Sequence, residues 1–411
     1  MRNLIIFIFL VLAMDAGAQT DLGSYIGKAI QNSPLLKEYQ NQQARNRLDS
    51  LRLKAGFGWQ VSANSTDTYA PVVKGWGYDN AVTNGANLSA TVSVSKEITG
   101  ARNRQNQFDA ISLQSQSVRN AGKISQQELK KEVSSLYVEA YGSWQQYLFE
   151  NEMLQFMVKQ KEVLQRLTQT GNARQTDFLS FMIGLQQQEL QTDGAKNQYR
   201  NNLALLQYTC GIDDTSLVEL SDPLLKTVVD ADFMQSPFYR QFEIDSLKLV
   251  NADQQIDLSY QPKVCLTADG GYLSSLVVQP YKNFGVSAGV SFSIPLYDGG
   301  QRKMQHEQVA IDQLTRIDYR NFYTAQYRQQ TRNLWQQLDA KQQLETKIEK
   351  QIEYAHTLVE AYHAQLEKGE VQITEYLMAI ENYMNARKML TENTLEKYRI
   401  IVELNYWNCS K

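Results

Sequence analysis

The chain has 411 residues, of which 43% are hydrophobic, and its formal net charge is −3 at pH 7. The near balance of charge, without a block rich in Lys and Arg, argues against a nucleic-acid partner. All seven prolines lie outside two long runs of helix-forming residues, so the composition does not favour ordinary compact domains.

The N-terminus has the pattern of an export signal. Arg2 supplies a positive charge, Leu4 to Ala13 form a short apolar core, and Ala16-Gly17-Ala18 is typical of a cleavage site. This core is shorter than the roughly 20 residues that a membrane-spanning helix needs. We therefore expect residues 1–18 to be a signal peptide and the mature chain to lie outside the cytoplasm. Its three cysteines, an odd number, do not favour a structural disulfide.

The mature chain contains one pattern twice. Ser33-Pro34 and Ser236-Pro237 each open an amphipathic stretch, and "TGNARQTDFL" corresponds to "KGEVQITEYL" later in the chain. These landmarks recur at an offset of about 200 residues, which indicates an internal duplication. We expect a first repeat at 19–210, a linker at 211–235 and a second repeat at 236–411.

Each repeat is predicted to hold a strand hairpin followed by a helical hairpin. Apolar and small polar residues alternate at about 57–97 and 263–295, as they do in membrane-barrel strands. Long runs without Pro predict helical hairpins at about 102–209 and 301–405. On the last strand, Val290 and Phe292 are expected to face lipid, because hydrocarbon cannot satisfy the hydroxyls of the alternating serines.

The stretch "SIPLYDGG" joins the last strand to a long helix. Pro295 ends the donation of ladder hydrogen bonds, and Asp298 precedes Gly299 and Gly300, whose conformational freedom allows a sharp change of direction. Gly100 is expected to serve the first repeat in the same way. A structural role is favoured for both turns.

Four strands per chain raise a problem of closure. An open sheet edge in hydrocarbon leaves backbone groups unpaired, at several kcal/mol each, and the smallest closed barrels have about eight strands. Two copies would supply about eight strands and three copies about twelve. The pattern alone does not choose between them.

Together these features resemble the TolC family of outer-membrane efflux proteins. The resemblance rests on the signal, the duplicated plan, "SIPLYDGG", and the tip sequences "GNARQTD" and "GEVQITE", and it spans residues 21–407. It implies a mainly α fold in which four strands per chain join a trimeric β-barrel in the outer membrane, above a long periplasmic helical barrel. It further implies an exit duct of a tripartite efflux or type I secretion system, served by a periplasmic adaptor and an inner-membrane transporter, without catalysis or cofactor.

The tips of the two helical hairpins are the expected periplasmic end of this duct. In the family, a Thr-Asp pair that matches Thr176 and Asp177 bonds to a Tyr and an Arg, but Leu366 and Val371 stand near the second tip here, so that closed-gate contact is not expected. Acidic residues at the mouth are expected to attract cations. The expected entrance residues are Thr176, Asp177, Thr374 and Glu375, and the expected adaptor contacts are Gly171, Asn172, Ala173, Gly369, Glu370 and Val371.

Two other readings of the sequence remain. His356, Glu360 and His363 share one helical face and could hold a metal, although a solvated coiled-coil surface is the favoured explanation. A periplasmic coiled-coil adaptor or structural protein would also have long helices, but it would not need two-faced strands. The sequence does not identify the cargo.

Overall fold

The computed structural model describes residues 21–71, 73–77, 85–171, 173–214, 216–227, 233–276, 279–366, 368 and 370–408. The expected signal peptide lies outside these residues. Within them, no helix combines the length and the apolar composition that crossing a membrane would require. The elements in chain order are α2 (Leu22–Asn32), α3 (Pro34–Gly56), β1 (Gln60–Tyr69), β2 (Ala86–Ile98), α4 (Ala101–Gln169), α5 (Gln175–Thr209), η2 (Phe233–Gln235), α6 (Pro237–Ser259), β3 (Lys263–Ser274), η3 (Pro280–Lys282), β4 (Phe284–Ser293), α7 (Gln301–Leu366) and α8 (Ile373–Trp407).

From α3 onward, the order of helix, strand, strand, helix and helix occurs twice. The chain packs as two compact units that cut across this repeat. The helical unit contains the described residues within Met1–Glu38, Gly122–Tyr239 and Phe322–Lys411. The sheet unit contains those within Tyr39–Ala121 and Arg240–Asn321. The repeat boundaries expected from the sequence stay a prediction.

The two helices that open the repeats begin in the same way. The backbone N–H of Leu36 donates to Ser33 Oγ at 3.3 Å, and that of Tyr239 donates to Ser236 Oγ at 3.2 Å. Pro34 and Pro237 follow these serines as the first helical residues, where a missing N–H costs nothing. Each Ser-Pro pair is therefore a local helix start.

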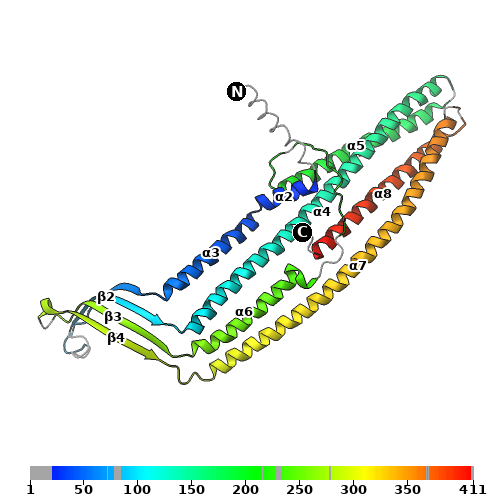
Figure 1. Cartoon of the computed structure of the whole chain (residues 1–411). Helices are drawn as coiled ribbons and strands as arrows, with labels where there is room; N and C mark the ends of the chain where they lie inside the picture. The colour runs from blue at the N-terminus through cyan, green and yellow to red at the C-terminus, as the bar shows by residue number, and fades with distance from the viewer. Residues whose placement is uncertain are drawn as a thin grey trace, which may run out of the picture. The chain divides into compact units, whose positions relative to one another are not determined.

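In the helical unit, α5 runs back along α4 and α8 runs back along α7 (Figure 1). An aromatic core joins α2 to the first hairpin, and Tyr25 and Tyr137 meet edge to face there with ring centroids 5.7 Å apart. Tyr137 donates to the backbone carbonyl of Ser221 at 2.8 Å, which fixes the segment between the repeats. Burial in this core raises the pKa of the Cys210 thiol to about 11.

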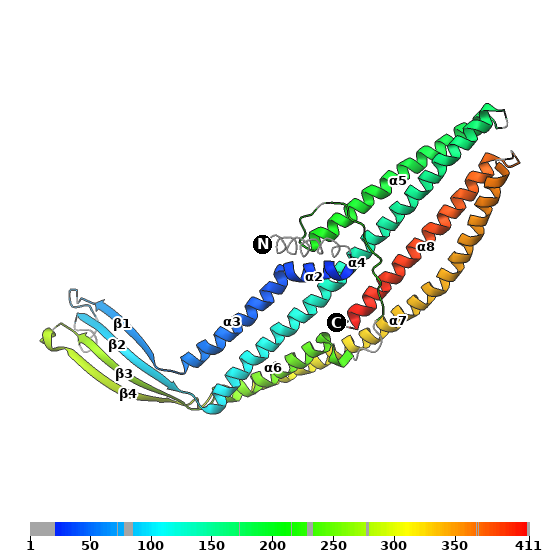
Figure 2. The same cartoon turned by 45° about the horizontal axis from the view of Figure 1, so that its top comes forward.

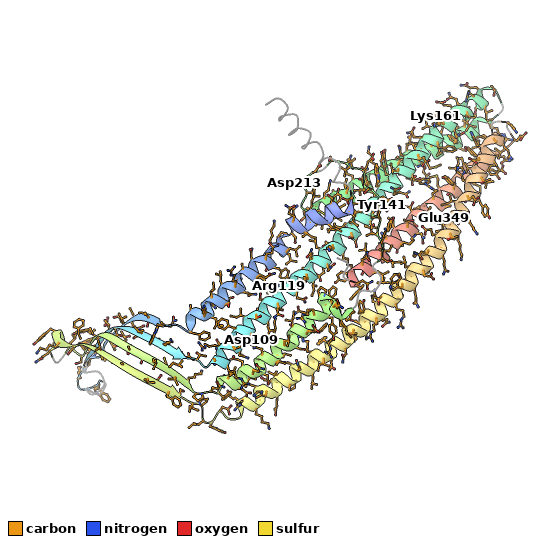
Figure 3. All side chains as sticks on the ribbon, viewed as in Figure 1. Asp109, Arg119, Tyr141, Lys161, Asp213 and Glu349 are labelled. Carbon is orange, nitrogen blue, oxygen red and sulfur yellow. The ribbon has the colours of Figure 1, made fainter. Side chains whose placement is uncertain are left out.

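The helical unit also joins the two repeats. A Cβ at Gly142 of α4 would lie 2.3 Å from the end of the Leu395 side chain in α8, so the leucine packs directly over this glycine. The adjacent Tyr141 lies edge to face with Tyr398, with ring centroids 6.5 Å apart (Figure 3 labels Tyr141). These contacts hold α4 against α8.

In the sheet unit, the four strands form one antiparallel sheet in the order β1-β2-β3-β4 (Figure 2). The first strand starts three residues later than the sequence pattern suggested. The N–H of Gly58 and the side chain of Gln60 both donate to the carbonyl of Ala55, which closes the end of α3. Phe57 instead packs against Phe108 of α4.

Polar contacts hold α6 between its neighbours in the sheet unit. The amides of Asn106 in α4 and Asn251 in α6 each donate to the other residue's backbone carbonyl, at 3.1 and 3.0 Å. On α7, Arg316 pairs with Asp245 of α6 at 3.3 Å. Because amide groups and ion pairs rather than apolar side chains make these contacts, the helices of the sheet unit do not form a hydrophobic core of their own.

The sheet unit buries little apolar surface by itself. Among its described residues, the buried hydrophobic side chains are Val118, Ile244 and Leu258. In contrast, Val286 is 91% exposed and Leu296 is 93% exposed. An isolated soluble domain of this size would normally hide such side chains, so this unit requires an apolar surrounding or further protein.

Gly271 provides a test of this sheet. A Cβ at Gly271 would lie 2.2 Å from the backbone oxygen of Ala90, whereas nothing lies within 4 Å of a Cβ at its strand partner Gly285. Gly271→Ala should therefore destabilise the sheet by about 1–3 kcal/mol, the usual cost of overpacking. Chemical denaturation in detergent micelles should show the loss, while Gly285→Ala should match the wild type; equal stability of the two variants would contradict this close approach.

Candidate functional site

The sheet has one apolar face. In an antiparallel ladder, residues directly opposite one another have their side chains on the same face of the sheet. The three observed registers therefore assign each strand residue to one of the two faces. Phe292 opposes Val264, which opposes Ile98, and Val290 belongs to the same face. The apolar face also includes Val61, Ala63, Tyr69, Leu88, Ala90, Val92, Val94, Leu266, Ala268, Tyr272, Phe284, Val286 and Ala288.

The opposite face is polar. It consists mainly of residues with short side chains, because Ser, Thr, Asn and Gly alternate with the apolar positions on all four strands. Ser291 opposes Cys265, and Cys265 opposes Glu97 on this face. The remaining small members include Ser62, Asn64, Thr66, Ser89, Thr91, Ser93, Ser95, Thr267, Ser287, Gly289 and Ser293.

The sheet is open at both edges. In the described part of the chain, β1 pairs only with β2 and β4 pairs only with β3. Every residue of these two edge strands is exposed. Each edge thus carries a row of backbone donors and acceptors that can pair with a further strand.

The turn between β4 and α7 combines left-handed backbone with a helix cap. Gly299 and Gly300 have φ of 67° and 82°, values that favour glycine. Asp298 accepts from the backbone N–H of Gly300 at 2.8 Å and from that of Arg302 at 2.7 Å. These hydrogen bonds, the one from Arg302 first, lower the pKa of the Asp298 carboxyl, and Pro295 lies at the start of the turn.

A charged cluster ties α6 to the first turns of α7. His306 Nδ1 lies 2.6 Å from Asp253 Oδ1, and its Nε2 lies 3.0 Å from Asp257 Oδ1. Arg302 Nη2 lies 2.7 Å from the same Asp257 oxygen. Both ring nitrogens of His306 can donate only when the imidazole is protonated, and the Asp253 hydrogen bond is the main cause that raises its pKa.

The first repeat has a different turn. Gly100 lies between β2 and α4, as expected, but it has no positive φ, so this turn does not use a left-handed glycine. The duplication aligns Asn103 and Gln107 with Arg302 and His306, and the Gln107 amide donates to Asn103 Oδ1 at 2.9 Å. An amide pair within one helix therefore occupies the place of the charged cluster.

The two hairpin tips lie in the helical unit. Gly171 has φ of 79°, and Ala173 and Val371 pack against an apolar cluster that includes Leu366 and Tyr376. Two of the expected adaptor contacts, Asn172 and Gly369, lie outside the described residues. Glu370 is exposed, so it is available to a partner, whereas Ala173 and Val371 also support the core.

The four expected entrance residues lie in the first turns of α5 and α8. Thr176 and Thr374 are exposed, and Asp177 is half-buried. Glu375 accepts from the backbone N–H of Gln372 at 3.3 Å and completes a capping box for α8. Glu375 thus has a structural task that the sequence pattern alone left open.

The candidate metal ligands are not gathered into a site. His356 Nδ1 lies 3.8 Å from Glu360 Oε1, but its ring also packs against Tyr383. His363 stacks on Tyr376, with ring centroids 6.3 Å apart. Across the described ranges, no group of three or more His, Cys, Asp or Glu side chains has a metal-binding arrangement.

The sequence interpretation missed the cluster around His306. Asp253 and Asp257 are spaced i, i+4 on one helix, and Arg302 and His306 have the same spacing on another. Two such pairs of opposite charge, next to a predicted turn, are a signal for ion pairing between the helices. The spacing alone does not show that these two pairs meet, because the contact depends on how α6 and α7 lie against each other.

His306 should make the α6–α7 junction sensitive to pH. Its pKa is raised in the folded chain, so its contribution to stability is complete below the unfolded value near 6.5 and is lost as pH rises through the folded pKa. Denaturation midpoints of wild type and His306→Gln should differ most at acidic pH, down to the range in which Asp257 itself is protonated, and converge above neutrality. His356→Gln, which alters an exposed histidine beside Glu360, is the matched control; a constant difference for His306→Gln would contradict the role assigned to the proton.

Known proteins share this fold. No protein-family model and no curated protein matches the sequence. Among solved structures, the open state of the MtrE outer membrane channel of Neisseria gonorrhoeae is similar, with a TM-score of 0.75 and 12% identity over 94% of this chain and 88% of that one. The outer membrane protein VceC of Vibrio cholerae has a TM-score of 0.74 and 14% identity over 94% and 95%. The Campylobacter jejuni CmeC outer membrane channel has a TM-score of 0.73 and 12% identity over 94% and 85%.

These likenesses cover nearly the whole of each chain, although few residues are identical. They agree with the duplicated order of helices and strands and with the four-stranded sheet described above. The resemblance read from the sequence is thereby confirmed for the fold. The chain has the fold of TolC-type outer-membrane channels.

Proposed function

We propose that this chain forms the wall of an outer-membrane exit duct. The single observation that carries the proposal is the two-faced sheet with two open edges. An exposed apolar face suits lipid, and a face of short polar side chains suits a water-filled lumen. Unpaired edges in hydrocarbon would cost several kcal/mol per backbone group, so strands of further copies must complete the wall.

Three copies are the proposed assembly. With β4 of each copy beside β1 of the next, three four-stranded sheets would close a barrel of about twelve strands. The helices offer a matching surface, because Met304, Ile311 and Leu314 on α7 and Leu48 and Leu51 on α3 are exposed apolar residues at helical spacing. A second copy would cover them and supply the core that the sheet unit lacks.

The likeness to outer-membrane channels supports an outer-membrane location, with the long helices in the periplasm. The proposed duct conducts passively and has no catalytic role. A periplasmic adaptor and an inner-membrane transporter are its proposed partners. Gly171 and Glu370, which are exposed, are proposed adaptor contacts together with Asn172 and Gly369, and the sequence "GNARQTD" carries Gly171 and Asn172.

The proposal is tested first by the location and conductance of the protein. Mature protein should fractionate with outer membranes, run as three copies in detergent and form pores in planar bilayers. Recovery as a soluble periplasmic protein would contradict the proposal. The alternative of a coiled-coil adaptor predicts that outcome.

Two neighbouring substitutions test which face meets lipid. Val290 lies near the middle of β4 on the apolar face, and Ser291 lies beside it on the polar face. Val290→Arg should cost about 2–4 kcal/mol and reduce assembled protein in the membrane, while Ser291→Arg should assemble normally. Phe292 is one residue from the strand end, so Phe292→Arg should cost only about 0–1 kcal/mol. The opposite ranking of Val290→Arg and Ser291→Arg would mean that the two faces are exchanged.

Asp177 and Glu375 are proposed to give the periplasmic mouth a negative potential. Three copies would bring six carboxylates to the mouth, and divalent cations added from that side should block conductance. Replacing both with Ala should weaken the block about tenfold, as measured by the half-blocking concentration in planar bilayers. Because Glu375 also caps α8, Glu375→Gln is the control that keeps a cap while it removes the charge. Unchanged block in the double variant would exclude these acids from the mouth.

A further inference from the structure

The polar face of the sheet carries three charged residues among its strand positions, Glu97, Lys263 and Asp269. Glu97 opposes Cys265, which is two residues from Lys263, so these opposite charges are diagonal neighbours at the helix-side end of the sheet. Asp269 is in the middle of β3 and has no such neighbour on the adjacent strands. It is therefore the one charge on this face that the sheet does not offset.

The surroundings of Asp269 give its carboxylate little hydrogen bonding. Ser93 and Ser287 are its direct partners on β2 and β4. The Asp269 Oδ2 atom lies 3.4 Å from Ser287 Oγ, which is longer than the usual hydrogen bond between oxygens. The side chain is half-buried, so part of its hydration is already lost. A carboxylate with weak protein partners favours an added cation.

A hollow of about 360 Å³ lies beside this carboxylate. Gly285, which opposes Gly271, places no side chain there, and nothing lies within 4 Å of a Cβ at Gly285. Its lining includes the polar-face residues Thr91, Asp269, Gly271, Leu273, Gly285 and Ser287, and Gly270, Asn283, Phe284 and Val286 complete it. One carboxylate, two hydroxyls and a leucine offer both hydrogen-bond acceptors and apolar contact.

We propose that this hollow is a subsite for small organic ammonium ions, with Asp269 as the residue that selects positive charge. The inference rests on the proposed function, because it requires the polar face to line the lumen. An ammonium group would donate to Asp269 and to the hydroxyls of Thr91 or Ser287, and its alkyl part would contact Leu273. The cargo class that this wall favours is thus cationic and amphiphilic.

The distances in a lumen explain why a hollow is needed for selection. Twelve tilted strands would place opposite backbones roughly 24 Å apart, which exceeds the Debye length of about 8 Å at physiological salt. Carboxylates on different copies would therefore act separately rather than as one ring. Preference for a cation must arise at each copy, by contact with the ion.

The test uses the full-length protein in planar bilayers, in a background in which Asp177 and Glu375 are Ala. Butylammonium is added on the side opposite the hairpin tips, and reversal potentials are measured in a KCl gradient. Asp269→Asn should raise the half-blocking concentration of butylammonium about fivefold or more and lower the ratio of K⁺ to Cl⁻ permeability about twofold. Asp67→Asn, the same change on the apolar face of β1, should alter neither value.

A second variant addresses the hollow itself. Gly285→Val would place a side chain in the hollow, and nothing lies within 4 Å of a Cβ at this position. It should weaken butylammonium block while leaving the K⁺ to Cl⁻ ratio unchanged. Pores of Asp269→Asn with wild-type block and reversal potential would overturn the subsite and leave the proposed duct intact. A wild type that forms no pores would overturn both.

Discussion

The need of backbone groups for hydrogen-bond partners is the constraint on which this structure depends. A four-stranded sheet whose first and last strands both have a free edge is incomplete, whatever its side chains. Its apolar face suits contact with lipid, and within lipid no water is available to hydrogen-bond the backbone groups at the edges. One arrangement satisfies both demands, namely a closed ring of copies. Three further features suit a channel wall that is completed when copies assemble. They are the short polar side chains of the sheet, the glycine turn before α7 and the exposed apolar residues on α3 and α7.

The two units of the chain differ in what holds them together. The helical unit has apolar cores of its own, including the buried Tyr137 and Tyr199. The sheet unit relies on ladders and polar contacts such as that between Asn106 and Asn251. Contacts within helical hairpins are close in sequence and form early, whereas β2 and β3 pair across more than 160 residues. We therefore expect the two helical hairpins to form before β2 and β3 pair, and the sheet to complete during assembly.

Much of the fold was readable from the sequence because it rests on local signals. The Ser-Pro helix starts, the alternation in the strands and the long runs without Pro gave the element order correctly. The sequence did not predict the strand register or the exact strand ends. In the structure β1 begins after Phe57, and Phe292 lies near the end of β4. The cluster around His306 and the hollow beside Asp269 were also out of reach, because each joins residues of different elements. Periodicity assigns a residue to a face, but not to its neighbour on the next helix or strand.

The two strand-to-helix junctions are alike in place and unlike in chemistry. The second has left-handed glycines and a cluster of Asp253, Asp257, Arg302 and His306, while the first has Asn103 and Gln107 at the matching positions. In a ring of three copies, six junctions would alternate between these two kinds. The backbone of such a ring approaches sixfold symmetry, but its electrostatic potential has only threefold symmetry. A partner that senses the charge around this belt would find three equivalent registers rather than six, and so duplication of the fold need not duplicate its binding positions.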